Sequence, residues 1–235
     1  MRVPLESLNV PIETRIRFTP RVLERIFNSI VLPRTISLLH GPERAPLSII
    51  AHNIAVSAAK SNDDAKCVFL DSGSNYSPSL VRMIASSSDI LERILVGNIM
   101  GLSDTTEMIR NLPRLSGISI IILDSLTGTL NLTGGPGTKG RQRELFHTLE
   151  ILRKTVNQYD THLLITDFSS KNWVSGEHSP IGGNVLSHAV DSVVRVDRLK
   201  KGENLIRILT ERCTYSRNPP GIIVRADSKG IRSIK

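Results

Sequence analysis

The segment from Gly41 to Ser48 keeps the spacing of a phosphate-binding loop but not its chemistry. Such a loop reads G-x-x-x-x-G-K-[ST] between a strand and a helix, and its backbone N–H groups and lysine bind the phosphates. Here Pro46 replaces the second glycine and Leu47 replaces the lysine. Because proline has no N–H group and leucine has no charge, the segment predicts a nucleotide-site architecture that has lost its chemistry.

Two residues of the types that hold a magnesium ion are kept. Ser48 and Asp124 supply the hydroxyl and the carboxylate that usually bind Mg²⁺ beside a nucleotide. One interpretation is a residual site that binds a nucleotide without hydrolysing it. In the other, Ser48 caps a helix and Asp124 ends a strand with local hydrogen bonds. We favour the second, because Glu43 places an acid where phosphates would lie. We therefore predict no catalytic residue, metal or cofactor, with Gly41, Ser48 and Asp124 as remnants.

A basic, glycine-rich segment is a candidate DNA contact. Lys139, Arg141 and Arg143 follow the glycines of residues 134–137. Flexible glycines beside cations suit a loop that follows a nucleic-acid backbone. The alternative is a solvated helix start, although cations at a helix N-terminus oppose the helix dipole.

Lys171 and Trp173 form a second candidate DNA contact. Trp173 is the only tryptophan of the chain and lies in a polar segment. A base stacked on an aromatic ring is typically worth ~1–3 kcal/mol. The alternative is that Trp173 packs onto its own domain or onto a protein partner. Asp167 and Glu177 weaken a purely electrostatic interpretation.

Apolar runs alternate with helical patterns along most of the chain. The expected strands cover residues 36–39, 67–70, 118–123, 162–166 and 193–196, and the expected helices cover about 20–29, 48–60, 78–87, 105–115 and 140–158. Strands separated by helices indicate βαβ units, so we predict an α/β fold with a mostly parallel sheet. The unbroken apolar run at 119–123 is typical of a central strand covered on both faces. Polar loops at 127–140 and 169–183 would leave the carboxyl ends of strands, where open α/β sheets bind ligands.

The C-terminal part of the chain has a different pattern. Residues 200–203 predict a hairpin between two strands, and 221–225 predict one more strand. We therefore expect antiparallel strands at one edge of the parallel sheet. Residues 1–17 are expected to be irregular, because Pro4 and Pro11 would break a helix. Residues 18–235 are expected to form a single domain.

The composition of the chain favours some classes of binding partner over others. The chain has 235 residues, 40% of them hydrophobic, and a formal net charge of +8. This charge favours nucleic acid or an acidic partner over a neutral small substrate, although an inert basic surface is the alternative. No apolar run approaches the ~18 residues of a membrane span, so we expect no membrane contact. Cys67 and Cys213 are far apart in the sequence, and we interpret them as free thiols. Free thiols are typical of a reducing compartment, so we predict a cytoplasmic location. If the protein binds DNA, we expect it to be associated with the nucleoid.

Three stretches together resemble the RecA-like core of the archaeal RadA and eukaryotic recombinase family. Residues 67–78 are similar to its second strand and the following turn, and 120–125 to its Walker B strand. Most specific is the sequence SPIGGNVLSHA at 179–189, which is similar to the segment that closes the second DNA loop of the family. The resemblance covers about residues 18–232 and implies a RecA-like three-layer sandwich, DNA repair by homologous recombination, and an archaeal origin.

Departures from the family pattern matter as much. The position of the catalytic glutamate that activates water is Gly73, and the polar sensor falls near Asp167 and Phe168. Neither the N-terminal helix-hairpin-helix domain nor the Phe-x-x-Ala polymerisation motif is visible. The resemblance therefore implies a recombinase paralogue reduced to its core, with a degenerate Walker A segment.

Three functions are compatible with these residues. The first is a pseudo-ATPase that binds DNA, preferably single-stranded, and modulates a recombinase or another repair protein. The second is a structural subunit without DNA affinity of its own, in a homo- or hetero-oligomer, for which Pro46 and Leu47 would suit protein contact. The third, which we disfavour, is a weak ATPase that takes a lysine from a neighbouring subunit.

Overall fold

A computed structural model describes residues 16–112, 116–132, 139–171, 178–181, 183–200, 202–214 and 219–234. Its strands are β1 (Ile36–Gly41), β2 (Lys66–Asp71), β3 (Ile94–Asn98), β4 (Ile118–Asp124), β5 (His162–Lys171), β6 (His178–Pro180), β7 (Ser192–Arg198), β8 (Leu205–Cys213), β9 (Ile222–Asp227) and β10 (Gly230–Ser233). Its α-helices are α1 (Glu24–Phe27), α2 (Arg44–Ala59), α3 (Pro78–Ala85), α4 (Leu102–Asn111), α5 (Leu126–Leu132), α6 (Lys139–Gln158) and α7 (Gly183–Ala189), with 3₁₀ turns η3 (Arg21–Leu23) and η4 (Asp89–Arg93).

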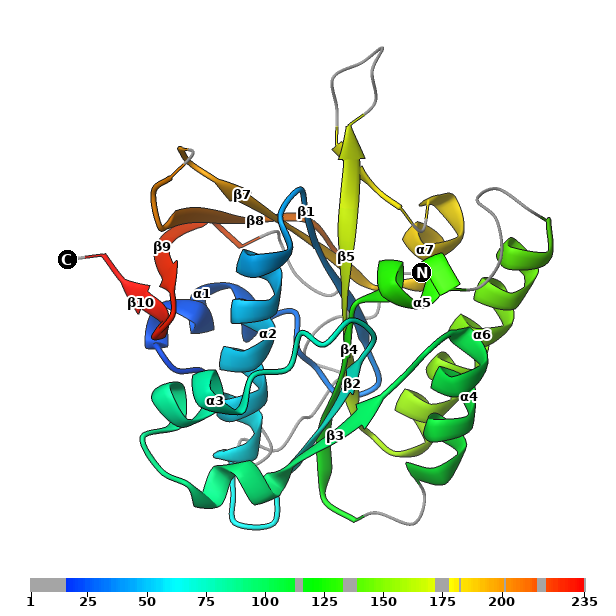
Figure 1. The fold of residues 1–235 in the computed structure, drawn as a ribbon, viewed down its shortest axis with the longest axis horizontal. Coiled ribbons are helices and arrows are strands. Elements are labelled where there is room, and N and C mark those ends of the chain that lie inside the picture. The colour runs from blue at the N-terminus through cyan, green and yellow to red at the C-terminus, as the bar shows by residue number, and fades with distance from the viewer. Residues whose placement is uncertain are drawn as a thin grey trace.

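The strands form one mixed sheet, as the sequence predicts (Figure 1). Within the described residues their order is β10-β9-β8-β7-β1-β5-β4-β2-β3, and β6 pairs with β5 off this path. Neighbours from β7 to β3 run parallel, and β8, β9 and β10 extend the sheet as antiparallel strands. The apolar run of β4 is buried from Ile120 to Leu123, which confirms its central place.

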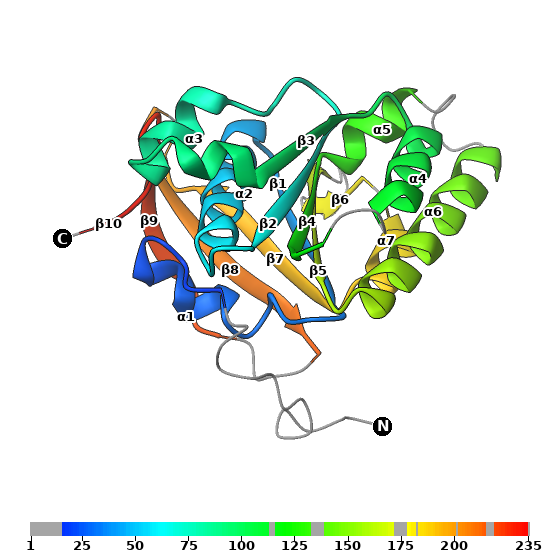
Figure 2. The ribbon, with the colours of Figure 1, turned by 90° about the horizontal axis from the view of Figure 1, so that it is seen from below.

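Helices cover both faces of the parallel part of the sheet (Figure 2). On one face, α1, α2 and α3 pack with Phe69 and Ile122 in one hydrophobic cluster. On the other, α4, α5, α6 and α7 pack with Ile121 and Leu123 in a second cluster. Alternate residues of one strand thus serve different clusters, which confirms the predicted three-layer sandwich.

Two expected loops contain regular structure. The loop expected at 127–140 includes α5, which forms because Leu126 and Leu130 are buried on one helix face and Ser125 Oγ accepts from Gly128 N. The loop expected at 169–183 includes the end of β5, the short β6 and the start of α7. The strands β3 and β10 were not expected, because they are short edge strands with little apolar alternation.

Other expectations hold with shifted bounds. The hairpin expected at 200–203 joins β7 to β8, and Leu199 N donates to Leu205 O across it. The expected irregular segment at 1–17 lies outside the described residues up to residue 15. In the part of the chain that the structure describes, no helix is both long enough and apolar enough to cross a membrane.

Candidate functional site

The junction of β1 and α2 is a tight turn. The strand ends at Gly41 and the helix begins at Arg44, so that only Pro42 and Glu43 connect them. A Cβ on Gly41 would lie 2.3 Å from the carbonyl oxygen of Val196, which explains the glycine by close contact with β7. In a phosphate loop the residues that follow the first glycine form a non-helical cradle of N–H groups. Here Arg44, Ala45 and Pro46 of this stretch belong to the first turn of α2.

Leu47 is part of the hydrophobic core. Its side chain is 1% exposed, inside the cluster that joins α2 to the sheet. Pro46 is also buried, and as a residue of the first helical turn it needs no N–H partner. The interpretation of Pro46 and Leu47 as a protein contact surface is therefore wrong, because this chain buries them itself.

The side chains of Ser48 and Asp124 form a hydrogen bond with each other. Ser48 Oγ donates to Asp124 Oδ2 at 2.8 Å, and Thr166 Oγ1 donates to Asp124 Oδ1 at 2.6 Å. Ser48 lies a full turn inside α2 and does not cap it, which corrects that part of the structural interpretation. Asp124 ends β4 and is buried, and burial raises the pKa of its carboxyl group above the usual value.

The turn after β2 contacts the triad formed by Ser48, Asp124 and Thr166. Asp71 is buried at the end of β2, and its carboxylate accepts from the backbone N–H groups of Gly73, Asn75 and Tyr76 at 2.9–3.0 Å. Asn75 Nδ2 donates in turn to the carbonyl of Asp124 at 3.1 Å. Gly73, where the resemblance predicts the catalytic glutamate of the family, therefore lies in a turn held by Asp71. The sequence analysis did not single out Asp71, although an acid before Ser-Gly-Ser-Asn is a turn signal.

His52 connects α2 to the same turn. Its Nδ1–H donates to Ser48 O at 2.7 Å, and its Nε2 accepts from Ser77 N at 2.9 Å, so the ring is neutral. The ring stacks on Tyr76 with centroids 5.5 Å apart. Burial lowers the pKa of His52. The arrangement holds the turn firmly and leaves this histidine without a free nitrogen.

The segments that lead to the two expected DNA loops are joined at their bases. Thr127 of α5 donates to the Asp167 carboxylate of β5, and Phe168 N donates to Thr127 Oγ1 at 3.1 Å. The guanidinium of Arg44 lies over the Phe168 ring, 5.4 Å from its centroid. Glu43 pairs with Arg198 at 2.8 Å, so the acid beside the turn is neutralised within the chain.

The helix α6 begins, and the strand β5 ends, on the side of the sheet where the parallel strands have their carboxyl ends (Figure 1). Lys139 and Arg143 are exposed in the first turns of α6, and Arg141 beside them is partly buried. Lys171 is the last residue of β5, and the structure describes its backbone but not its side chain. Trp173 lies outside the described residues altogether. The helix α7 contacts both α6 and β6 and so links the two regions.

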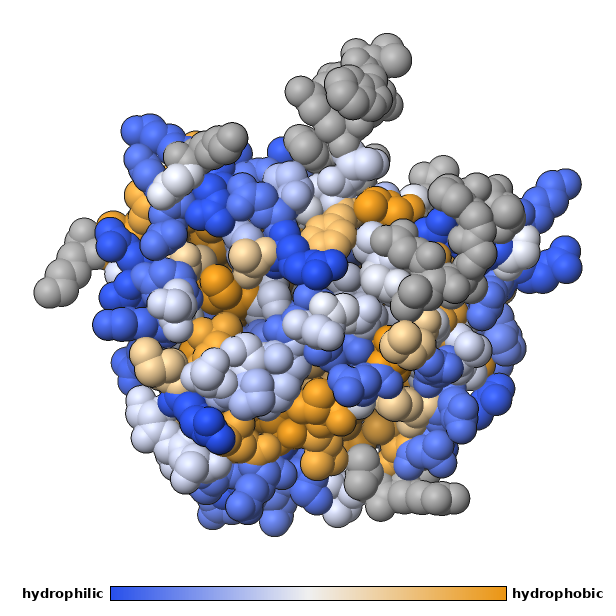
Figure 3. Space-filling model, in the orientation of Figure 1, coloured by the Kyte–Doolittle hydropathy of each residue, from blue (hydrophilic) through white to orange (hydrophobic). Residues whose placement is uncertain are grey.

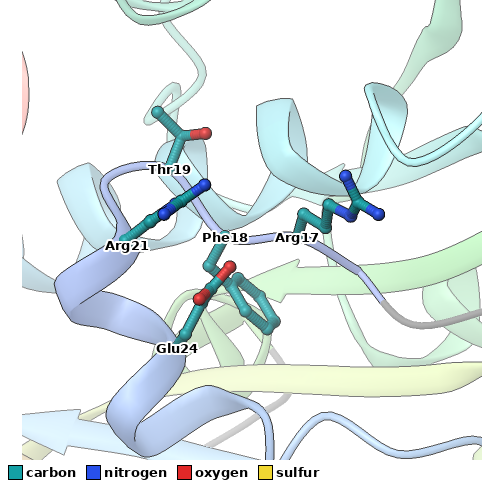
Figure 4. A pocket seen from close by; sticks show the side chains of 5 residues that line it. All are labelled: Arg17, Phe18, Thr19, Arg21 and Glu24. Carbon is teal, nitrogen blue, oxygen red and sulfur yellow. The ribbon is translucent and has the colours of Figure 1, made fainter. Parts of the chain in front are cut away.

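Two other surface features stand apart from this site. Figure 3 shows an apolar area on the side of the molecule where β3 lies. A hollow of about 430 Å³ lies beside η3 and α1. Figure 4 shows the residues that line it, Arg17, Phe18, Thr19, Arg21 and Glu24. None of the residues that line the hollow belongs to the triad or to the candidate DNA contacts.

Known proteins share both the sequence pattern and the fold. Residues 13–218 match the family model described as Rad51. The chain is 20% identical to the DNA repair protein RAD51 of Mycosarcoma maydis, over 82% of this chain and 65% of that protein. It is 24% identical to the DNA repair and recombination protein RadA of Methanocorpusculum labreanum, over 80% of this chain and 67% of the relative.

A solved structure shows the same fold. The crystal structure of the RadB recombinase superimposes with a TM-score of 0.75 at 16% identity, over 91% of this chain and 96% of that one. The chain spans less than two thirds of the length of two matched curated relatives, RAD51 of Mycosarcoma maydis and a RAD51 homolog of Arabidopsis thaliana. A family match that runs from residue 13 to residue 218, through β1, β4, β5 and α7, leaves one conclusion: the chain belongs to the Rad51 family.

Proposed function

We propose that this chain is a non-catalytic member of the recombinase family that binds DNA, preferably single-stranded, and modulates recombination or repair. The observation that carries the non-catalytic part is the burial of Leu47 in the core, where an active family member would need a lysine. The chemistry of phosphoryl transfer depends on positioning and charge neutralisation. A buried leucine supplies neither.

Ser48, Asp124 and Gly73 support the same proposal. The Ser48 hydroxyl donates a hydrogen bond to one carboxylate oxygen of Asp124, and the Thr166 hydroxyl donates to the other. Gly73 offers no carboxylate to activate water, and a Cβ added there would already lie 3.3 Å from Asn75 Nδ2. The residues of the β1–α2 turn therefore fit a structural junction better than a magnesium and nucleotide site.

The DNA part rests on charge. Lys139 and Arg143 are exposed at the start of α6, whose first turn contains no acidic residue. Lys139, in the first turn, opposes the helix dipole at a cost of about 0.3–1 kcal/mol. The net charge of +8 gives the whole chain an attraction for polyanions. A phosphate backbone is a ligand that offsets the unfavourable placement.

Fluorescence anisotropy of a labelled oligo(dT) tests this function. We expect binding at low salt that weakens steeply as salt is added, and weaker binding to the matching duplex. In parallel, phosphate release from ATP should stay at background with and without DNA. The absence of any anisotropy change at micromolar protein and low salt would remove the proposal.

A protein-binding subunit is the second candidate, and one observation favours it. Among the described strands, β3 pairs only with β2 and leaves its other edge open. Val96 in this strand and Met100 just after it are 43% and 70% exposed. An open edge with apolar side chains can pair with a strand of another protein. A stoichiometric partner that co-purifies from the native host, together with no DNA affinity of the isolated chain, would favour this function.

A further inference from the structure

We infer that Phe146 of α6 is a base-stacking residue for single-stranded nucleic acid, and that Lys139 and Arg143 hold the backbone beside it. This inference rests on the DNA binding proposed above and adds a residue that the sequence patterns did not indicate. It concerns the exposed face of one long helix, not the segments that precede or follow it.

Phe146 differs from every other phenylalanine of the chain. The sequence contains five of them. Phe18, Phe27 and Phe69 are buried in the core, and Phe168 packs partly against it beneath Arg44. The side chain of Phe146 is 61% exposed. A single exposed apolar residue is ordinary on a protein surface, so its surroundings decide what it does.

Those surroundings are basic. Lys139, Arg143 and Phe146 are spaced by four and three residues, which places them on one face of α6. We call these three residues the α6 stripe. With a rise of 1.5 Å per residue, the stripe extends over about 10 Å. The helix buries a different face, formed by Leu145, Leu149, Leu152 and Val156, in the hydrophobic cluster on this side of the sheet. The ring and the two cations therefore face outward together.

The charges of the stripe are not neutralised locally. Among the residues that the structure describes, Lys139 and Arg143 make no ion pair within 4 Å. The next exposed acid along the helix, Glu150, pairs with Lys154 at 3.6 Å. Two uncompensated cations beside an exposed ring match a ligand that alternates phosphates with flat bases. An apolar protein surface would leave both cations without partners.

A substitution series at position 146 tests the inference. Phe146→Ala should weaken binding of oligo(dT) roughly 5- to 150-fold, the usual range for one stacked base. Phe146→Tyr keeps the ring and should stay within about twofold of the wild type. Met83→Ala, an exposed apolar residue on α3, is the matched control and should bind as the wild type does. Melting temperatures of all variants check that each one folds.

A spectroscopic measurement separates stacking from a general loss of affinity. In Phe146→Trp combined with Trp173→Phe, the only tryptophan lies at position 146. Addition of oligo(dT) should quench its emission in step with the anisotropy change. Emission that stays constant while anisotropy reports binding would overturn the stacking role.

The outcomes distinguish this inference from the proposed function. If the wild type binds DNA and Phe146→Ala binds equally well, the stacking role is wrong and DNA binding stands. If Phe146→Ala instead loses a co-purifying protein, the ring serves a protein interface and the inference is also wrong. If the wild type binds no DNA, both fail.

Discussion

The Ser48 hydroxyl donates a 2.8 Å hydrogen bond to the Asp124 carboxylate, where a bound magnesium ion would need both groups. Thr166 occupies the other carboxylate oxygen. This pairing makes Asp124 an acceptor for two hydroxyl groups in the core. The burial that raises its pKa costs stability at neutral pH, and the hydrogen bonds partly offset that cost.

Substitutions at Asp124 separate these roles. Asp124→Ala should lower the free energy of unfolding by roughly 1–3 kcal/mol, because two buried hydroxyls lose their acceptor. Asp124→Asn keeps an acceptor and removes the buried charge, so its stability should lie within about 1 kcal/mol of the wild type. Urea denaturation measures both, and DNA affinity should not change in Asp124→Asn. A folded Asp124→Asn that lost a nucleotide-dependent activity of the wild type would contradict a structural role.

Restoring the lysine should fail to restore a phosphate site. Leu47→Lys would place an ammonium group in the core, at a cost of up to roughly 4–7 kcal/mol. Leu47→Met keeps the volume and should cost under about 1.5 kcal/mol. Thermal unfolding and titration with a fluorescent ATP analogue test the pair. A stable Leu47→Lys variant that binds Mg²⁺-ATP would show that the turn retains a working cradle.

The sequence predicts the fold well because its strongest patterns are local. The apolar run at 119–123 and the alternation of strands with helices indicate a parallel sheet without any tertiary information. The helix α5 was missed because two leucines on a short segment that contains Gly128 give almost no periodic signal. Its burial depends on the sheet face that it covers.

Only part of the candidate site could be predicted from the sequence. The sequence shows Leu47 at the spacing where a phosphate loop has its lysine, but the burial of Leu47 depends on how α2 packs. The bonds from Ser48 and Thr166 to Asp124 join three separate elements, and no spacing rule predicts them. His52 reads as an ordinary helical histidine until the turn after β2 folds against it.

Stability should fall as the solution becomes acidic, well before the carboxylates titrate. His162 lies buried between Ser37 and Thr35, and burial lowers its pKa to about 3. Burial lowers the pKa of His52 too. In the unfolded chain both histidines would have a pKa of about 6.5. The unfolded state therefore binds more protons below this value, and stability that is present above pH ~6.5 is lost toward pH ~3.

The expected slope is up to about 1.4 kcal/mol per pH unit for each of these histidines. Urea midpoints at pH 7.5, 6 and 5 measure it. His147→Gln removes an exposed histidine and should leave the slope unchanged, whereas His162→Asn should flatten it. A wild-type stability that is constant or rises between pH 7.5 and 5 would contradict the buried neutral histidines.

The cations of α6 should be visible in the salt dependence of DNA binding. Lys139→Gln and Arg143→Gln should each reduce the slope of log K against log salt by about 0.7, the value for one single-strand phosphate contact. Lys154→Gln removes an exposed lysine farther along the same helix that already pairs with Glu150, and should change the slope little. Slopes for Lys139→Gln and Arg143→Gln that equal the wild-type slope would mean that these two residues of α6 do not contact the backbone.

Calorimetric titration with Mg²⁺-ATP, followed by titration with oligo(dT) in the same buffer, tests the central claim most directly. With Leu47 in the core and Ser48 bonded to Asp124, we expect no heat of nucleotide binding and an oligo(dT) affinity that is the same with and without ATP. Saturable magnesium-dependent ATP binding that Asp124→Asn abolishes, with DNA affinity that depends on it, would contradict the account.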